Sequence, residues 1–300
     1  MARKPDYRSV PRRFRRPRLL VLGCGDVGLR LAALAAGRAR VFGVVRRADA
    51  AAAVRDAGAV PIVADLDRWR SLRRLQGLAS TIVHSAPPPP LGDDDPRTRR
   101  ALARLHRARR WVYLSTTGVY GDCGGARIDE TRPVAPRSDR ARRRVAAERR
   151  LRRRAAILRV PGIYARDRLP EQRLRAGTPA ILAGEDGYSN HIHADDLARI
   201  VWAATLRAPI GRVYNAVDDT ELRIGDWLDA VASALSLPAP LRLPRAQVEA
   251  IVSPLQWSFL SESRRISNAR IKRELGIRLR YPTVHALLGR LPDRAGADII

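Results

Sequence analysis

The sequence has few of the residues that mark several large classes of protein. Its 300 residues include two cysteines, Cys24 and Cys123, which lack metal-ligand spacing and do not suggest an oxidising compartment. No apolar run approaches the roughly 18 residues that a membrane-spanning helix needs, and the N-terminus has no signal-peptide core. We therefore expect a cytoplasmic globular protein with reduced thiols and no membrane partner.

Lysine is nearly absent, although the chain is strongly basic. Of 57 basic residues only Lys4 and Lys272 are lysines, and the formal net charge is +27. A field of this sign attracts nucleic acid, anionic lipid and phosphorylated ligands. The arginines are nevertheless spread over both halves of the chain, and few aromatic residues accompany them as base-stacking platforms. The sequence therefore disfavours a specific nucleic-acid partner.

Short apolar runs alternate with segments of helical periodicity. The expected strands cover residues 19–22, 40–45, 60–63, 81–84, 111–115, 156–160 and 212–216. Strands that alternate with helices imply right-handed crossovers and a parallel sheet covered on both faces. We predict an α/β protein with a Rossmann-type doubly wound parallel sheet and a smaller C-terminal lobe.

A glycine-rich turn joins the first expected strand to the first expected helix. In a GxGxxG turn the first glycine permits the tight bend, the second lets a pyrophosphate approach the backbone, and the third lets helix and strand pack closely. The N-terminus of the helix adds free N–H groups and partial positive charge. A dinucleotide site is therefore predicted at Gly23, Cys24, Gly25, Asp26, Val27 and Gly28.

The end of the second expected strand bears on the choice between NAD and NADP. It carries Arg46 and Arg47, whose guanidinium groups suit a ribose 2′-phosphate. Asp49 lies close enough to bind a 2′-hydroxyl instead. NADP(H) is the preferred cofactor and NAD(H) remains possible, with Asp65 and Leu66 expected beside the adenine.

These patterns divide the chain into parts. We expect residues 1–17 to be a basic arm without fixed structure and residues 292–300 to be a loose tail. Residues 18–165 are expected to form the NAD(P)-binding Rossmann domain, completed by about 191–235. Residues 166–190 and 236–291 remain for a substrate-binding lobe.

Three later segments complete a family pattern. They read LSTTGVYG at 114–121, LRVPGIY at 158–164 and NHIHADDL at 190–197. With the glycine turn, they resemble the extended short-chain dehydrogenases/reductases, also called the NAD-dependent epimerase/dehydratase family, from about residue 18 to 291. The resemblance implies a substrate lobe that often binds a nucleotide sugar, adds Ser85 and Pro161 to the cofactor site, and makes a homodimer possible.

The chemistry of this family uses a Ser or Thr, a Tyr, and a Lys four residues after the Tyr. Thr116 stands at the first position. By alignment on the Ala-Ala-Glu at 146–148, Arg140 stands at the Tyr position and Arg144 at the Lys position. Arginine keeps its proton in proteins, so Arg140 does not replace a tyrosine as general acid or base. The chain therefore resembles the atypical branch that lacks Tyr-x-x-x-Lys.

The missing tyrosine leaves the proton source open. The family positions offer Tyr120, Tyr164 and His193, none of them favoured by spacing alone. Arg144 is expected to hold a ribose hydroxyl, and Arg140, one helical turn away, to grip an anionic group of the substrate.

Two further patterns have structural explanations. His191 and His193 stand near two aspartates, but alternate residues of an extended segment point to opposite faces, so we predict no metal site. We expect Asp195 to cap the helix that follows. A helix N-terminus can lower the pKa of a thiol such as Cys24 and make it redox-sensitive, but small size at a crowded turn explains this cysteine as well.

Together these observations predict an NAD(P)-dependent oxidoreductase or epimerase that acts on a small, anionic or sugar-like substrate. The alternative is a non-catalytic NADP(H)-binding sensor or assembly protein, which the loss of the Tyr and Lys supports. Whether the protein is an enzyme stays open at this stage.

Overall fold

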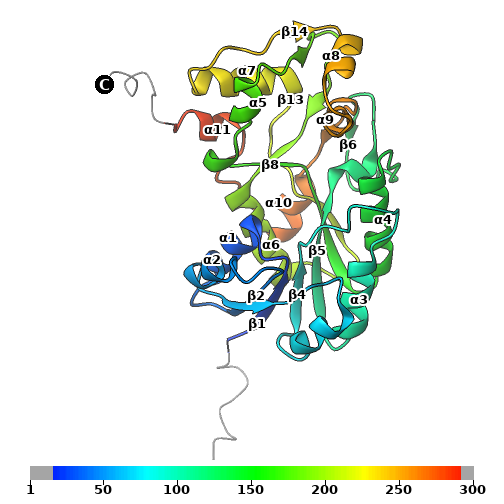
Figure 1. Cartoon of the computed structure of the whole chain (residues 1–300), viewed down its shortest axis with the longest axis vertical. Helices are drawn as coiled ribbons and strands as arrows, with labels where there is room; N and C mark the ends of the chain where they lie inside the picture. Colours follow the sequence, from blue (N-terminus) through cyan, green and yellow to red (C-terminus); the bar gives the residue numbers. More distant parts are fainter. Residues whose placement is uncertain (1–15, 292–300) are drawn as a thin grey trace, which may run out of the picture.

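The computed structural model describes residues 16–291 and shows one large parallel sheet beneath a smaller lobe (Figure 1). Most of the expected arm and all of the expected tail lie outside the described residues. The seven strands are β1 (Arg18–Leu22), β2 (Arg40–Val45), β3 (Val60–Val63), β4 (Thr81–His84), β5 (Arg110–Thr116), β7 (Ala155–Val160) and β12 (Val213–Asn215). Their order is β12-β7-β5-β4-β1-β2-β3, and every neighbouring pair is parallel. The strand order reverses between β1 and β4, as in a Rossmann fold.

Helices cover both faces of this sheet, which explains why its strands are continuous apolar runs. One face packs against α1 (Asp26–Ala35), α2 (Ala51–Asp56), α6 (Ala194–Arg207) and α10 (Ala269–Leu275). The other packs against η3 (Trp69–Leu75), α3 (Pro96–Arg104) and α4 (Asp139–Leu151). All six residues of β7 are buried. Each fully buried leucine or isoleucine side chain stabilises the fold by about 1.5–3 kcal/mol. A strand in which polar residues alternated with apolar ones would bury about half as many such side chains and lose about half of the strand's total gain.

The smaller lobe has a core of its own. Trp227, Leu228 and Val231 of α7 (Ile224–Ala234) pack with Leu174 of α5 (Glu171–Arg175) and Leu287 of α11 (His285–Leu288). The lobe also contains α8 (Arg245–Ile251) and α9 (Pro254–Leu260). Short strand pairs complete the structure: β8 (Gly162–Tyr164) with β11 (His191–His193), β9 (Ala180–Ile181) with β14 (Arg242–Leu243), β10 (Tyr188–Ser189) with β13 (Leu222–Arg223), and β6 (Arg127–Ile128) with β15 (Arg265–Ile266). Single-turn elements are η4 (Thr117–Tyr120) and η5 (Arg166–Arg168).

The chain crosses between sheet and lobe more often than the sequence indicates. Helix α7, expected with the Rossmann domain, contributes to the lobe core, whereas α10, expected in the lobe, packs against α6 on the sheet. An amphipathic pattern shows that a helix has an apolar face but does not identify what covers that face.

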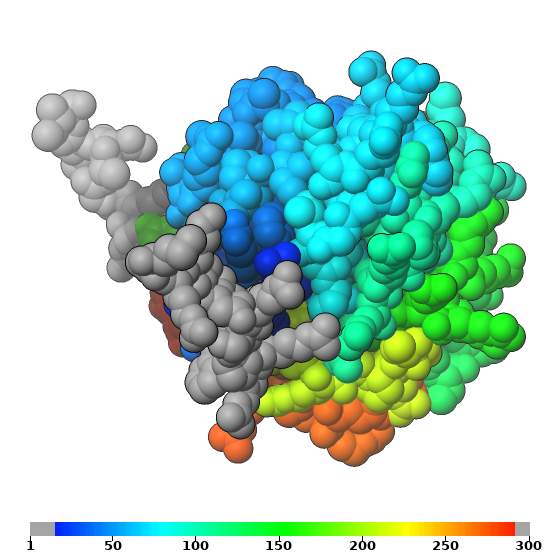
Figure 2. Space-filling model, turned by 90° about the horizontal axis from the view of Figure 1, so that it is seen from below, coloured from blue at the N-terminus to red at the C-terminus, as the bar shows by residue number. Residues whose placement is uncertain are grey.

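Seen from the end opposite the lobe, the molecule presents mainly its first half. Figure 2 shows that blue and cyan segments, from the first third or so of the chain, make up much of this surface.

Within residues 16–291, no helix has the length and apolar character to cross a membrane.

Candidate functional site

Three adjoining hollows lie at the carboxyl ends of the sheet strands, where they meet the lobe. The turn cavity, about 320 Å³, is lined by the glycine turn, Thr116, Arg140 and Arg144. The strand-end cavity, about 230 Å³, adjoins it through Gly23. The lobe cavity, about 250 Å³, shares Thr116, Arg140 and Pro161 with the turn cavity. In open α/β sheets, ligands bind at this edge near the reversal of strand order.

The glycine turn has the geometry that a pyrophosphate requires. Gly23 has a φ of +83°, and a Cβ there would lie 2.7 Å from the backbone of Ala86. A Cβ at Gly25 would meet no protein atom within 4 Å, so the space beside this backbone is open to a ligand. No side chain caps the first turn of α1, which leaves its N–H groups available for an anion.

Cys24 lies beneath the turn and does not line any of these cavities. Its N–H donates to the carbonyl oxygen of Val44 at 2.8 Å, and a Cβ at Gly28 would meet its sulfur at 3.2 Å. Burial raises the pKa of the Cys24 thiol to about 11. The alternative of a low-pKa, redox-sensitive thiol is therefore wrong, because desolvation at this packed position disfavours the thiolate.

Asp26 and Val27 line the turn cavity with the glycines. The Asp26 carboxylate accepts hydrogen bonds from Arg30 at 2.8 Å and Arg168 at 2.6 Å. Burial acts to raise the pKa of Asp26, but these two arginines lower it below its usual range. The acidic residue of the turn is thus neutralised where a phosphate would approach. Arg168, on η5 of a distant segment, was not predicted.

The strand-end cavity contains most of the predicted adenosine-side residues. Arg46, Asp65 and Leu66 line it. Arg47 does not, because it is hydrogen-bonded to Asp49 at the surface. Asp49, the alternative ligand for an NAD ribose, therefore already has a cationic partner. Sequence reasoning missed Arg97, which lines this cavity from α3.

The predicted residues at the ends of β4 and β5 also meet at the turn cavity. Thr116 Oγ1 accepts from the N–H of Gly118 at 3.2 Å, and its own hydrogen remains available to a ligand. Ser85 Oγ donates to the carbonyl oxygen of Gly23 at 2.7 Å and so supports the turn. Sequence reasoning missed Ser115, a buried lining residue whose hydroxyl has no partner among the described residues. The sequence could have indicated Ser115, because it stands beside Thr116 at the end of a strand.

Arg140 and Arg144 point from one side of α4 into the turn cavity. Arg144 Nη1 donates to the carbonyl oxygen of Leu114 at 2.8 Å and lies 3.1 Å from the hydroxyl of Tyr113, which fixes the side chain. The Arg140 guanidinium lies 4.1 Å from the ring centroid of Phe259, in the wall shared with the lobe cavity. Burial and then the charge of Arg144 lower the pKa of Arg140.

The three candidate proton donors lie outside these cavities. The buried Tyr120 hydroxyl donates to Asn215 Oδ1 at 2.7 Å, and burial raises its pKa. Tyr164 is buried among the rings of His193, His191 and Trp227. The structure thus does not bring any of the three to Thr116.

His193, not Asp195, is the N-cap of α6. The His193 ring accepts from the N–H of Asp195 at 3.2 Å and stacks on Tyr281. Asp195 lies in the first turn, where it accepts from Arg30 at 2.6 Å. Burial lowers the pKa of His193, so the neutral ring supplies the acceptor that we expected from the carboxylate. Among residues 16–291, no three His, Cys, Asp or Glu side chains gather as metal ligands.

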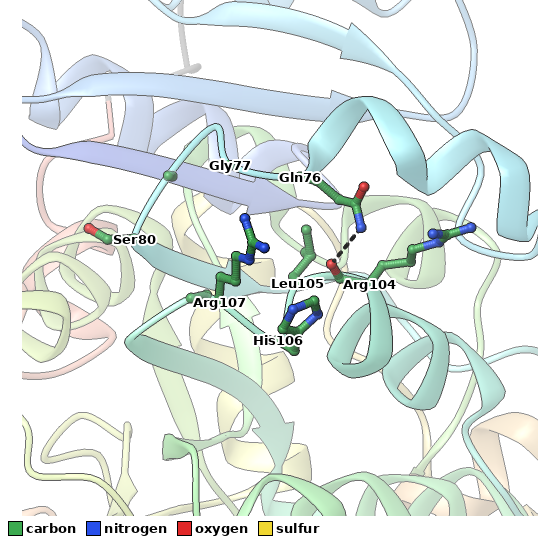
Figure 3. A pocket seen from close by; sticks show the side chains of 9 residues that line it. Gln76, Gly77, Ser80, Arg104, Leu105, His106 and Arg107 are labelled. Carbon is green, nitrogen blue, oxygen red and sulfur yellow. Dashed lines mark hydrogen bonds between the residues drawn. The ribbon is translucent and has the colours of Figure 1, made fainter.

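A separate hollow of about 450 Å³ lies at the opposite, amino end of the sheet (Figure 3). It lies between the loops before β4 and β5, and the Gln76 amide donates to the carbonyl oxygen of Arg104 across it at 3.3 Å. His106 and Arg107 project beside it. Despite its size, it lies away from the strand ends that form the dinucleotide turn.

Comparisons with known proteins agree with this geometry. No family model matches the chain. A functionally unknown conserved protein from Silicibacter pomeroyi is 32% identical, with 92% of this chain and 98% of that chain covered and a TM-score of 0.78. A putative NAD-dependent epimerase/dehydratase from Methylobacillus flagellatus is 25% identical, with 92% and 97% covered and a TM-score of 0.69.

Two further matches are to a distant structural neighbour and to a part of a curated relative. The dTDP-glucose 4,6-dehydratase of Bacillus anthracis, solved in complex with NAD, is 15% identical, covers 92% of this chain and 95% of its own, and has a TM-score of 0.74; it shows the fold alone. A curated relative, the 3-diazoavenalumate denitrifying reductase of a Streptomyces species, is 30% identical over 127 residues. That match spans 42% of this chain and 41% of the relative.

The fold and the glycine turn together define a Rossmann-type α/β protein with a turn of the kind that binds nicotinamide dinucleotides. Structural neighbours of the chain are members of the NAD-dependent epimerase/dehydratase family, and the chain shares their fold. Arg140 and Arg144 stand where the family resemblance expects Tyr and Lys.

Proposed function

We propose that this protein is an NADP(H)-preferring oxidoreductase that acts on a small anionic substrate. The observation that carries the proposal is the shared wall of Thr116, Arg140 and Pro161 between the turn cavity and the lobe cavity. A molecule in one cavity lies beside a molecule in the other along this wall. The match to a named reductase supports the same class of reaction.

The residues of the turn cavity fit a nicotinamide dinucleotide. The open space at Gly25 and the uncapped start of α1 would hold the pyrophosphate, and Arg144 would reach a ribose hydroxyl. Arg46 would bind the 2′-phosphate of NADP, because Asp49 is held by Arg47. When bound, the cofactor would supply the hydride.

The side chains at the wall would act on the oxygen of the reacting carbon. Thr116 donates a hydrogen bond to this oxygen, and Arg140 stabilises the negative charge that develops there. Arg140 stays protonated, so the proton that completes an alcohol comes from water. Arg140 thereby stabilises the charge and water supplies the proton, two tasks that a tyrosine performs in the family.

The proposal is tested by turnover with NADPH deuterated at the hydride position. We expect deuterium to enter a product from a pool of small metabolites. The variants T116V and R140Q should each lower kcat by about 10²- to 10³-fold, the usual effect of removing one donor to a developing oxyanion. Failure to change NADPH absorbance or to exchange the hydride with any pool would overturn the proposal.

A non-catalytic NADP(H)-binding sensor is the second candidate. The observation that favours it is the position of Tyr120, Tyr164 and His193 outside the cavities. This candidate predicts that NADPH binds and stays chemically unchanged in every metabolite pool, so the deuterium experiment separates the two.

A further inference from the structure

The lobe cavity contains one positive charge without a protein counter-charge. Its charged lining residues are Arg140, Arg264 and Glu262. Arg264 pairs with Glu262 at 2.6 Å and donates to the carbonyl oxygen of Gly121 at 2.7 Å. No carboxylate among residues 16–291 pairs with Arg140, which instead lies over Phe259. A ligand with a single negative charge would therefore balance the net charge of the lining residues.

The histidine in the cavity does not alter this count. His191 is buried, and its Nε2 is 2.9 Å from Ser189 Oγ. Burial lowers the pKa of His191 to about 4, so the ring is neutral at neutral pH. The charge offered to a ligand is therefore that of Arg140 alone.

The rest of the lining is rich in hydroxyl and amide groups. These belong to Thr117, Ser138, Ser189, Asn190 and Ser258. Four of them also have partners in the protein: Ser138, Ser189, Asn190 and Ser258. A hydroxyl group with one such partner can still bond to an alcohol or carboxylate oxygen of a ligand, because it has one donor and two acceptor sites.

The size of the cavity limits the ligand further. At about 250 Å³ it lies below the roughly 300–1,000 Å³ of pockets that hold drug-sized ligands. A nucleoside diphosphate sugar brings a base, a ribose and at least two negative charges, which exceed both the space and the single free cation. One ring or a short chain with one carboxylate matches both.

We propose that the lobe cavity binds a small hydroxylated monocarboxylic acid, with its carboxylate on Arg140 and its hydroxyl groups on the serine and threonine side chains. The proposal rests on the proposed function and names its substrate class. It places the carboxylate beside Thr116, so the reacting carbon lies close to the acid group. Arg140 is then a specificity-determining residue as well as a catalytic one.

Paired probes test the charge directly. Full-length protein saturated with NADP⁺ is titrated calorimetrically with D-glucuronate and D-glucose, with D-glycerate and glycerol, and with UDP-glucose. We expect each acid to bind at least about tenfold more tightly than its neutral partner, and UDP-glucose to bind no more tightly than glucose. In R140Q the preference for the acids should disappear. In R149Q, which removes an exposed arginine of the same helix, it should persist.

Three results would overturn the substrate class: equal binding of acids and neutral partners, tighter binding of UDP-glucose than of any acid, or no binding of either acid at 10 mM. A preference for acids that survives in R140Q would overturn the role of Arg140. A separate titration with NADP⁺ alone reports on the proposed function. Failure of NADP⁺ to bind is thus distinguishable from failure of the acids.

Discussion

Arg140 shows how a single residue changes the chemistry available to this fold. A tyrosine at this place in the family gives and takes a proton, whereas a guanidinium offers a permanent charge and fixed donors. Arg140 lies in the wall between the turn cavity and the lobe cavity, so under the proposed function its charge would act on cofactor and substrate together. Under the proposed function, the consequence at this residue is catalysis through charge stabilisation rather than proton transfer.

Gly25 provides a test of the cofactor position that does not depend on the reaction. The variant G25V should retain the stability of the ligand-free protein, because an added Cβ meets no atom within 4 Å and the φ of −89° suits an L-residue. It should weaken NADPH binding by about tenfold or more, since the side chain fills the space beside the backbone. Fluorescence titration and thermal unfolding measure the two effects.

The matched variant is G28V. Here the added side chain meets Cys24 and Val21 at 3.2 Å, so we expect a lower unfolding temperature without ligand. NADPH binding by G25V at the parental affinity would show that the pyrophosphate lies elsewhere.

Arg46 tests the preference for the phosphorylated cofactor. In R46Q we expect NADPH affinity to fall about tenfold or more, with NADH affinity unchanged, because a charge-assisted hydrogen bond contributes about 1.5–3 kcal/mol. R47Q is the control, since Arg47 is engaged by Asp49. The measurement is the dissociation constant of each cofactor for each variant. Equal losses of NADPH affinity in R46Q and R47Q would contradict the assignment of the 2′-phosphate to Arg46.

At the scale of elements, a buried ion pair fastens α4 to the sheet. Arg159 of β7 donates to Glu148 of α4 at 2.9 Å, and both side chains are less than a tenth exposed. This link holds the helix that carries Arg140 and Arg144 against β7. The polar pair thus positions two site residues without touching the site.

Breaking this pair should be costly. In E148A the guanidinium of Arg159 stays buried without its partner, and we expect a loss of about 3–5 kcal/mol of unfolding free energy, measured by urea denaturation. The double variant E148M/R159L should recover most of it, because it buries no lone charge. Equal stability of E148A and the parent protein would contradict the account.

Features that depend on neighbouring residues were predictable from the sequence, whereas features that depend on contacts between distant residues were not. The strands β2 and β4 begin and end where their apolar runs do, since burial on both faces leaves a continuous signal. The edge strand β3 also matches its apolar run, although none of its four residues is fully buried. The glycine turn was predictable because its six residues act within one strand, turn and helix. Arg264 and Phe259 were not, because they come to the cavity of Arg140 from more than a hundred residues away, and no local pattern records that proximity.

At the scale of the whole molecule, sheet and lobe meet around Asp218. This residue follows β12, and its N–H donates to the carbonyl oxygen of His191 in β11 at 2.8 Å. The buried carboxylate accepts from the N–H of Thr220 at 2.9 Å. Burial raises the pKa of Asp218 to about 7, and the hydrogen bonds from Thr220 offset this only in part.

This raised pKa predicts a pH-dependent stability. The folded protein holds the Asp218 proton up to about pH 7, whereas the unfolded chain loses it near pH 3.8, so folding loses stability as the pH rises through this window. In D218N that loss is absent. We therefore expect the unfolding temperature of D218N minus that of the parent to increase from pH 4 to 7 and then level off. A difference that stays constant with pH would contradict the shift.

The most direct test of the account is thermal unfolding with NADPH, NADP⁺, NADH and NAD⁺, each at several concentrations. A ligand that binds only the folded state stabilises it by about 2.7 kcal/mol at a hundred times its Kd. We predict a concentration-dependent rise in unfolding temperature that is larger for the two phosphorylated cofactors. No rise with any of the four would contradict the account and leave only the family fold.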